Sequence, residues 1–111
     1  MSVDSGKVVV FVTTSGEEEA EKIASLLLEQ RKAACVNVIP RVRSRFWWQG
    51  KLDSVQESLL IIKTRAALVP ELTEVVKKAH SYTVPEIVAL PIVAGNKDYL
   101  DWVDQETNQT S

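Results

Sequence analysis

The 111-residue chain has one cysteine, one histidine and no apolar run that approaches the length of a membrane helix. A single cysteine, Cys35, excludes a disulfide within the chain and is typical of a reducing compartment. A membrane helix needs about 20 apolar residues, and the first residues lack the basic and apolar regions of a signal peptide. We therefore expect a cytoplasmic protein that does not interact with membranes.

Motifs that carry catalysis are also absent from the sequence. There is no HExxH or CxxC motif, no glycine-rich phosphate loop and no nucleophile elbow. No acid–base pair or activated nucleophile can be assembled from the residues that remain. The net charge of −2 gives no general attraction to nucleic acid. The sequence thus predicts a protein that is not an enzyme and does not bind nucleic acid.

What the chain does contain is typical of one globular domain. Apolar residues make up 45% and charged residues 25%. The length allows one hydrophobic core, so we expect a single domain over residues 1–111, with an ordered core from about 7 to 105 and disordered polar ends. Hydrophobic periodicity predicts strands at 7–14, 35–47, 51–64 and 86–94, and helices at 17–32, 66–80 and 96–105.

This order predicts an α+β fold, a ferredoxin-like βαββαβ sandwich with a short C-terminal helix. In that topology the first and third strands are central and the other two are edges. Ser15 and Glu18 have the spacing of a capping box for the first helix, and Asn96 suits the N-cap of the last. Pro91 cannot donate to a strand ladder, which indicates an edge position for the last strand.

The second and third strands form an unusually long hairpin. Each would run about 40 Å, whereas a domain of this size has a radius of gyration of only about 13 Å. The hairpin should therefore protrude. A three-residue turn at 48–50 places Trp47 opposite Lys51. The expected pairs are then Arg45 with Asp53, Arg41 with Glu57, Phe46 with Leu52, Val38 with Leu60 and Val36 with Ile62.

A protruding hairpin with free edges needs a partner. The exposed sheet face would carry Ile39, Leu59 and Ile61, which are too apolar to face water comfortably. A closed ring of copies removes both problems without growing into fibres, so we expect a homotrimer. The residues expected at its interfaces are Arg41, Arg43, Arg45 and Trp47. The arginines could equally form a solvated ion-pair ladder, because the predicted register neutralises two of them.

Two residues are candidate metal ligands, each with a simpler alternative. His80 either caps the end of the second helix or binds copper or another divalent cation, since imidazole suits copper and zinc. Cys35 either packs as a small hydrophobe or supplies a thiol ligand. One ligand from each subunit of a ring could complete an interfacial site. No cofactor is required by the sequence.

Other polar and aromatic residues are candidates for a ligand cleft between subunits. Trp48 suits stacking on a small ligand or anchoring an interface. The remaining candidates are Glu57, Lys63, Tyr82 and Glu86. Nothing in their spacing identifies the ligand.

Several motifs resemble those of the CutA divalent-cation tolerance proteins. They are Ala33-Ala34-Cys35-Val36-Asn37, Trp48-Gln49-Gly50-Lys51, Ile62-Lys63-Thr64, His80-Ser81-Tyr82-Thr83-Val84-Pro85-Glu86 and Tyr99-Leu100-Asp101-Trp102. The resemblance implies a ferredoxin-like trimer, similar in architecture to PII signalling proteins, with a role in tolerance of copper and other divalent cations. It also implies copper ligands at a first-strand cysteine and a histidine pair, where this chain has Val12 and Ala79-His80.

The leading hypothesis is a non-enzymatic homotrimer in the response to divalent cations, with weak copper binding through His80. One alternative is a PII-like signalling module that binds a small anionic ligand between subunits. A second alternative is a structural scaffold.

Overall fold

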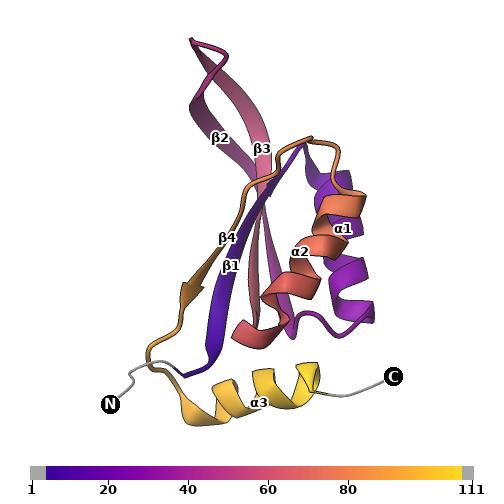
Figure 1. Cartoon of the computed structure of the whole chain (residues 1–111), viewed down its shortest axis with the longest axis vertical. Helices are drawn as coiled ribbons and strands as arrows, with labels where there is room; N and C mark the ends of the chain where they lie inside the picture. Colours follow the sequence, from indigo (N-terminus) through magenta and orange to yellow (C-terminus); the bar gives the residue numbers. More distant parts are fainter. Residues whose placement is uncertain (1–4, 109–111) are drawn as a thin grey trace.

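The computed structural model describes residues 5–108 (Figure 1). Its elements are β1 (Lys7–Thr14), α1 (Glu17–Glu29), β2 (Cys35–Trp48), β3 (Lys51–Arg65), a 3-10 turn (Ala66–Leu68), α2 (Val69–Ala79), β4 (Ile87–Pro91) and α3 (Lys97–Thr107). The predicted order and α+β class are confirmed. The polar ends predicted to be disordered lie largely outside the described residues.

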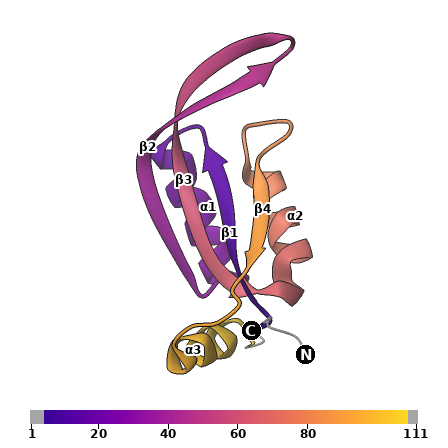
Figure 2. The ribbon, with the colours of Figure 1, turned by 90° about the vertical axis from the view of Figure 1, so that its left-hand side faces the viewer.

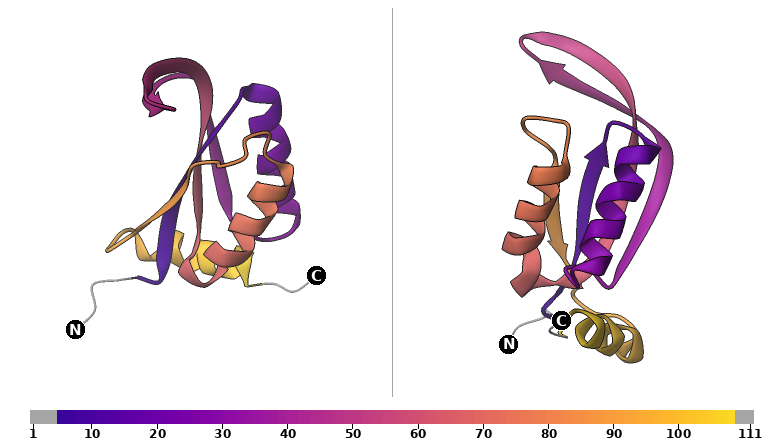
Figure 3. Two further views of the ribbon diagram at one scale, coloured as in Figure 1. Left: turned by 45° about the horizontal axis from the view of Figure 1, so that its top comes forward. Right: turned by 90° about the vertical axis from the view of Figure 1, so that its right-hand side faces the viewer.

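The four strands form one antiparallel sheet in the order β2-β3-β1-β4. The predicted central position of the first and third strands is therefore confirmed. Helices α1 and α2 lie side by side over one face of this sheet, and α3 lies across its lower end (Figures 1 and 3). Every second residue of β1 points into the core between sheet and helices. The core consists mainly of Val10, Val12, Ile23, Leu27, Leu60, Ile62, Leu72 and Val76, none of which is exposed.

The opposite face of the sheet is left uncovered by α1 and α2, which lie behind it in Figure 2. The strand register places apolar residues opposite one another there: Phe11 pairs with both Ile61 and Val88, and Ile39 pairs with Leu59. We call this surface the open face; it consists of Val9, Phe11, Ile39, Leu59, Ile61, Val88 and Leu90. Ile39, Val88 and Leu90 are 41%, 46% and 47% exposed.

The β2–β3 hairpin protrudes as predicted. It rises above the rest of the chain and curls over at its tip (Figures 1 and 2). The radius of gyration is 14.7 Å and the longest extent 43 Å, compared with the radius of about 13 Å expected for a compact domain of this length. The sheet thus continues beyond the helices that cover it.

The predicted register is wrong at the hairpin tip. The turn contains two residues, Gln49 and Gly50, which both have positive φ (52° and 78°), so Trp48 pairs with Lys51. Positive φ at both central positions is the geometry of a type I′ turn, whose twist matches the flanking strands. Because of this, Arg45 lies opposite Ser54 and not Asp53.

A β-bulge separates the hairpin tip from its base. Pro40 and Arg41 together oppose one residue of β3, Ser58, and Arg41 has a φ of 62°. Below the bulge the predicted pairs Val38–Leu60 and Val36–Ile62 are confirmed, whereas the predicted pair Arg41–Glu57 is wrong. Among the described residues, none of the three hairpin arginines forms an ion pair. The extra residue exchanges the two faces of β2 above this point.

The N-terminal cap of α1 differs from the predicted cap, whereas the cap of α3 agrees with it. The N-cap of α1 is Gly16, and Glu19, not Glu18, accepts a hydrogen bond from the backbone N–H of Ser15 (3.1 Å). Helix α1 also ends earlier than predicted, because Arg31 adopts a φ of 59° and closes the helix. The predicted cap of α3 is confirmed: Asn96 Oδ1 accepts from the N–H of Asp98 (3.0 Å).

Candidate functional site

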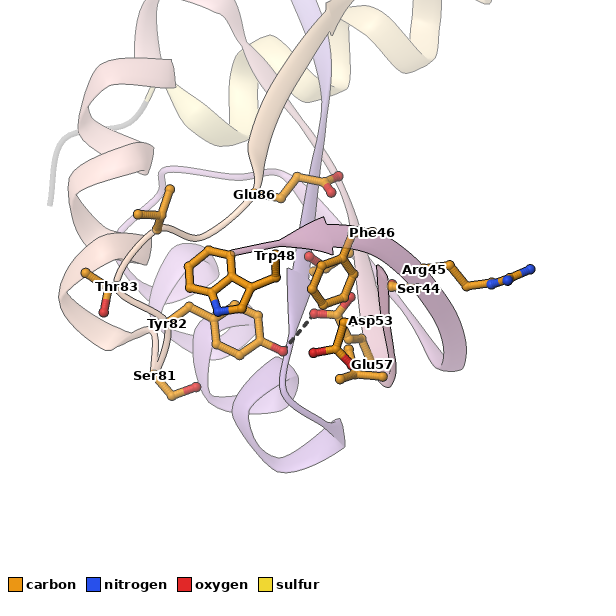
Figure 4. A pocket seen from close by; sticks show the side chains of 13 residues that line it. Ser44, Arg45, Phe46, Trp48, Asp53, Glu57, Ser81, Tyr82, Thr83 and Glu86 are labelled. Atoms are coloured by element: carbon orange, nitrogen blue, oxygen red, sulfur yellow. Dashed lines mark hydrogen bonds between the residues drawn. The ribbon is translucent and has the colours of Figure 1, made fainter. Parts of the chain in front are cut away.

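A hollow of about 710 Å³ lies between the tip half of the hairpin and the loop 80–86 that joins α2 to β4 (Figure 4). Its lining combines aromatic rings, carboxylates and small polar groups. The residues that line it are Thr13, Ser44, Arg45, Phe46, Trp48, Asp53, Val55, Glu57, Ser81, Tyr82, Thr83, Val84 and Glu86.

One wall of the hollow is a single face of the hairpin. Ser44 pairs with Val55 and Phe46 pairs with Asp53, so these side chains share a face with Trp48, which is two residues further along. The bulge at Pro40–Arg41 is what turns this face towards the hollow, because it shifts the alternation of β2 by one residue. Trp47 consequently lies on the other face of the hairpin, where it is 71% exposed.

The other wall is held by His80, whose side chain is fully buried. Its Nδ1 accepts a hydrogen bond from the backbone N–H of Tyr82 (3.0 Å), so the ring proton is on Nε2, which donates to the carbonyl of Thr13 (2.7 Å). The ring also contacts the Tyr82 ring at a centroid distance of 4.7 Å. His80 therefore fixes the loop to the end of β1.

Tyr82 crosses the hollow to the hairpin. Its hydroxyl donates to Oε2 of Glu57 at 2.7 Å, and Glu57 is only 6% exposed. Burial, followed by the hydrogen bond and the negative charge of Glu57, raises the pKa of Tyr82 to about 12. The phenol thus stays protonated and joins the loop to β3.

Glu19 fastens the start of the same loop to α1. Its carboxylate accepts from the N–H groups of Ser15 (3.1 Å) and Ser81 (2.9 Å), and Oε1 lies 3.6 Å from Nδ1 of His80. Burial alone would raise the pKa of Glu19, but the hydrogen bonds from Ser15 and Ser81 outweigh it and lower that pKa. The loop is therefore held to β1 through His80, to α1 through Ser81 and to β3 through Tyr82.

The charge of the hollow is predominantly negative. Asp53, Glu57 and Glu86 contribute carboxylates. Arg45 is the only basic residue in its lining among residues 5–108, and its guanidinium projects away from the other labelled side chains (Figure 4). With aromatic rings between the carboxylates, the hollow can attract a cation and does not favour an anion.

Four of the five residues predicted for the cleft line this hollow: Trp48, Glu57, Tyr82 and Glu86. Lys63 lies elsewhere, hydrogen-bonded to Asn37 near the base of the hairpin. The sequence prediction missed Phe46 and Asp53. Phe46 lies two residues before Trp48 and pairs with Asp53, so the three share a face. This face can be predicted to line the hollow only if Pro40 is recognised as part of a bulge in an edge strand, where proline is tolerated.

The residues predicted for interfaces all lie on the hairpin. Arg41 occupies the bulge and lines a second hollow with Glu17 and Glu57. Arg43 and Arg45 lie opposite Gln56 and Ser54, and both are exposed. Their role at an interface stays a prediction.

The predicted metal ligands do not come together within one protomer. His80 bonds to Thr13, which pairs with Leu59 of β3, whereas Cys35 pairs with Lys63. Four residues along a strand correspond to about 13 Å. Cys35 is half-buried beside Tyr99, and both ring nitrogens of His80 have partners.

Within one protomer these residues therefore do not form a copper centre, and a site shared between subunits stays a prediction. Within residues 5–108, no three histidine, cysteine, aspartate or glutamate side chains are placed to hold a metal ion. Imidazole binds a metal through a free nitrogen lone pair, and at His80 that lone pair accepts the N–H of Tyr82.

A search of the described helices for a membrane-spanning segment found none that combines sufficient length with sufficient hydropathy.

The fold and the hollow define a ferredoxin-like α+β protein with an extended hairpin and an aromatic, acidic cleft. Residues 8–106 match the family described as CutA1 divalent ion tolerance protein. The chain belongs to this family, so the predicted resemblance is confirmed.

Relatives and solved structures agree with this assignment. The chain is 52% identical to the divalent-cation tolerance protein CutA of Thermus thermophilus, over 89% of this chain and 96% of the relative. It is 45% identical to the rice protein CutA 1, chloroplastic, over 93% of this chain, but spans only 58% of that protein's length.

Among solved structures, the Thermus thermophilus divalent cation tolerance protein matches with a TM-score of 0.90 at 50% identity, over 91% of this chain and 98% of that one. The structure described as the periplasmic divalent cation tolerance protein CutA of Archaeoglobus fulgidus matches with a TM-score of 0.89 at 44% identity, over 91% and 98%. The compartments in these names differ, so family membership does not decide where this chain resides.

Proposed function

We propose that this chain acts in the tolerance of divalent cations as a ring of three copies that does not catalyse a reaction. The process comes from the names of its relatives, which describe tolerance and not catalysis. The observation that carries the assembly is the open face. We also propose a cytoplasmic location, because the free thiol of Cys35 suits a reducing compartment.

The open face is an unsatisfied surface in a single copy. Its apolar side chains extend across all four strands, from Ile39 on β2 to Leu90 on β4. Contiguous exposed apolar patches on soluble proteins mark interaction sites. The outer edges of β2 and β4 also have unpaired backbone groups, and a protruding hairpin can reach a neighbouring copy. If the β2 edge of one copy contacts the β4 edge of the next, the copies close into a ring, and three is the smallest number of copies for such a ring.

The function can be tested in cells that lack their own member of this family. Growth would be measured at increasing copper concentration with the wild-type chain, with Leu90→Lys on the open face, or with Leu28→Lys on α1 as the control. Leu90 and Leu28 are 47% and 41% exposed, but only Leu90 is on the open face. We expect the wild type and Leu28→Lys to restore tolerance and Leu90→Lys to fail. Equal growth of all three strains would contradict the proposal.

The response acts on a divalent cation, and we propose that His80 does not bind this cation. Calorimetric titration of copper into the wild type and into His80→Ala should give indistinguishable isotherms, because both nitrogens of the ring are already hydrogen-bonded. Loss of copper binding in His80→Ala, with the fold retained, would restore His80 to the metal site.

The hollow supports ligand binding as a second candidate function, in the manner of the PII-like module considered from the sequence. Its volume of about 710 Å³ lies within the usual range of small-molecule sites. The anionic ligand of that hypothesis is disfavoured, however, because three carboxylates line the hollow and Lys63 lies outside it.

A further inference from the structure

We propose that the hollow under the hairpin binds a small organic cation, a molecule that carries a primary or quaternary ammonium group. This inference goes beyond the role in divalent-cation tolerance.

Three aromatic rings from two separate segments face the hollow. Trp48 and Phe46 come from the hairpin and Tyr82 from the loop, and all three line the hollow (Figure 4). The face of an aromatic ring carries partial negative charge and attracts an ammonium group within about 6 Å, most strongly at tryptophan. Trp48 is 55% exposed, so its face is available to a ligand.

The negative carboxylates in the lining also attract a cation, in addition to the aromatic rings. Glu57 is 6% exposed, and its carboxylate accepts a hydrogen bond from the hydroxyl of Tyr82. Asp53 pairs with Phe46 across the hairpin, so one aromatic ring and one carboxylate lie directly beside each other. Low-dielectric walls around such charges strengthen their field within the hollow.

The same arrangement argues against other ligands. An inorganic divalent ion needs several oxygen ligands at short distance, and no three acidic side chains in residues 5–108 are so placed. An anion would meet three carboxylates with one distant guanidinium. A ligand with a diffuse positive charge and apolar substituents can contact the faces of the aromatic rings and is also attracted by the carboxylates.

The loop and the hairpin face that line the hollow are also preorganised. His80 and Glu19 hold the loop through three backbone groups, the carbonyl of Thr13 and the N–H groups of Tyr82 and Ser81. The bulge holds Trp48 on the correct face of the hairpin. A site formed in advance loses less entropy when the ligand binds.

The test is titration of the full chain with tetramethylammonium, and with tert-butanol as an uncharged molecule of similar shape, followed by NMR of the tryptophan indole signals. Trp48→Leu removes the ring that faces the hollow, and Trp47→Leu removes its neighbour on the opposite face. Asp53→Asn removes a lining charge, and Asp101→Asn removes a charge on α3. Molar mass is measured in the same samples.

We expect tetramethylammonium to bind and tert-butanol to bind at least about tenfold more weakly. Trp48→Leu and Asp53→Asn should each weaken binding by on the order of tenfold, and the two control variants should leave it unchanged. Equal binding of both probes would show a plain apolar hollow, and displacement by Mg²⁺ at matched ionic strength would show a metal site. Either outcome overturns the inference.

The same samples separate this inference from the proposed ring. Tetramethylammonium binding to a monomer would contradict the ring alone. A trimer without binding would contradict the ligand inference alone.

Discussion

At the residue scale, His80 is a buried connector and not a free imidazole. It accepts the N–H of Tyr82 and donates to the carbonyl of Thr13, while Glu19 lies beside it. The sequence suggested either a helix cap or a metal ligand for this residue. Neither description anticipates its bond to β1, because that contact joins residues 67 positions apart.

Replacing His80 with alanine should destabilise the chain. The substitution removes the hydrogen bonds of the buried ring to the carbonyl of Thr13 and from the N–H of Tyr82, and leaving such groups unsatisfied costs about 1–3 kcal/mol each. We expect a loss of about 2 kcal/mol or more in the free energy of unfolding, measured with urea at fixed protein concentration. The exposed Lys78→Ala should change it by less than about 0.5 kcal/mol. Equal effects of the two substitutions would contradict the connector role.

Tyr82 predicts a specific dependence of stability on alkaline pH. Its pKa is raised to about 12 in the folded chain, above the unfolded value of about 10. A raised pKa contributes stability that is fully present below pH 10 and is lost as the pH rises through 12.

The wild type should therefore lose stability between pH 10 and pH 12 relative to Tyr82→Phe, which lacks the ionisable group. Ultraviolet absorbance of phenolate would follow the titration of Tyr82 directly, with Tyr99→Phe to assign the other tyrosine. A parallel decline of the wild type and Tyr82→Phe over this range would be inconsistent with the Tyr82–Glu57 bond.

At the element scale, the hairpin shows how far the sequence determines this fold. Hydrophobic periodicity predicted both strands, and the apolar ladder below the bulge has the predicted register. The tip register could not be inferred from charge pairing, because Arg45 and Asp53 are solvent-exposed and contribute little to pairing. Pro40 was the available signal, since proline in a strand indicates an edge or a bulge.

The candidate site was predicted only in part, because the bulge at Pro40 was not recognised from the sequence. The loop residue Tyr82 and the strand residue Glu57 were identified as polar groups in a cleft, and the structure joins them by a hydrogen bond. The predicted pair of Phe46 with Leu52 is wrong, since Phe46 pairs with Asp53; one unrecognised bulge residue inverts every side chain of the strand beyond it.

The two-residue turn makes a prediction about Gly50. Its φ of 78° is one that residues with a Cβ rarely adopt, although no atom lies within 4 Å of the Cβ that would be added. Gly50→Ala should therefore cost about 1–2 kcal/mol through backbone strain alone. Gly95→Ala is the control, because its added Cβ would make an ordinary contact with Leu100 at 3.6 Å. Thermal unfolding of both variants measures the difference, and equal midpoints would contradict the turn geometry.

At the scale of the whole molecule, two surfaces have different uses. The open face is apolar and extends across the whole sheet, so it suits contact with other copies. The hollow under the hairpin is aromatic and acidic, so it suits a small cation. The hairpin contributes to both, because it continues the sheet beyond the helices and then curls over the loop 80–86 (Figure 2).

The central claim is that the open face is covered by other copies of the same chain. Sedimentation equilibrium at micromolar concentration tests it most directly. We expect a mass of about three times the 12.4 kDa of one chain, with Leu90→Lys reduced towards a single chain and Leu28→Lys unchanged. A wild-type mass of 12.4 kDa at that concentration would show that the open face is not covered by other copies.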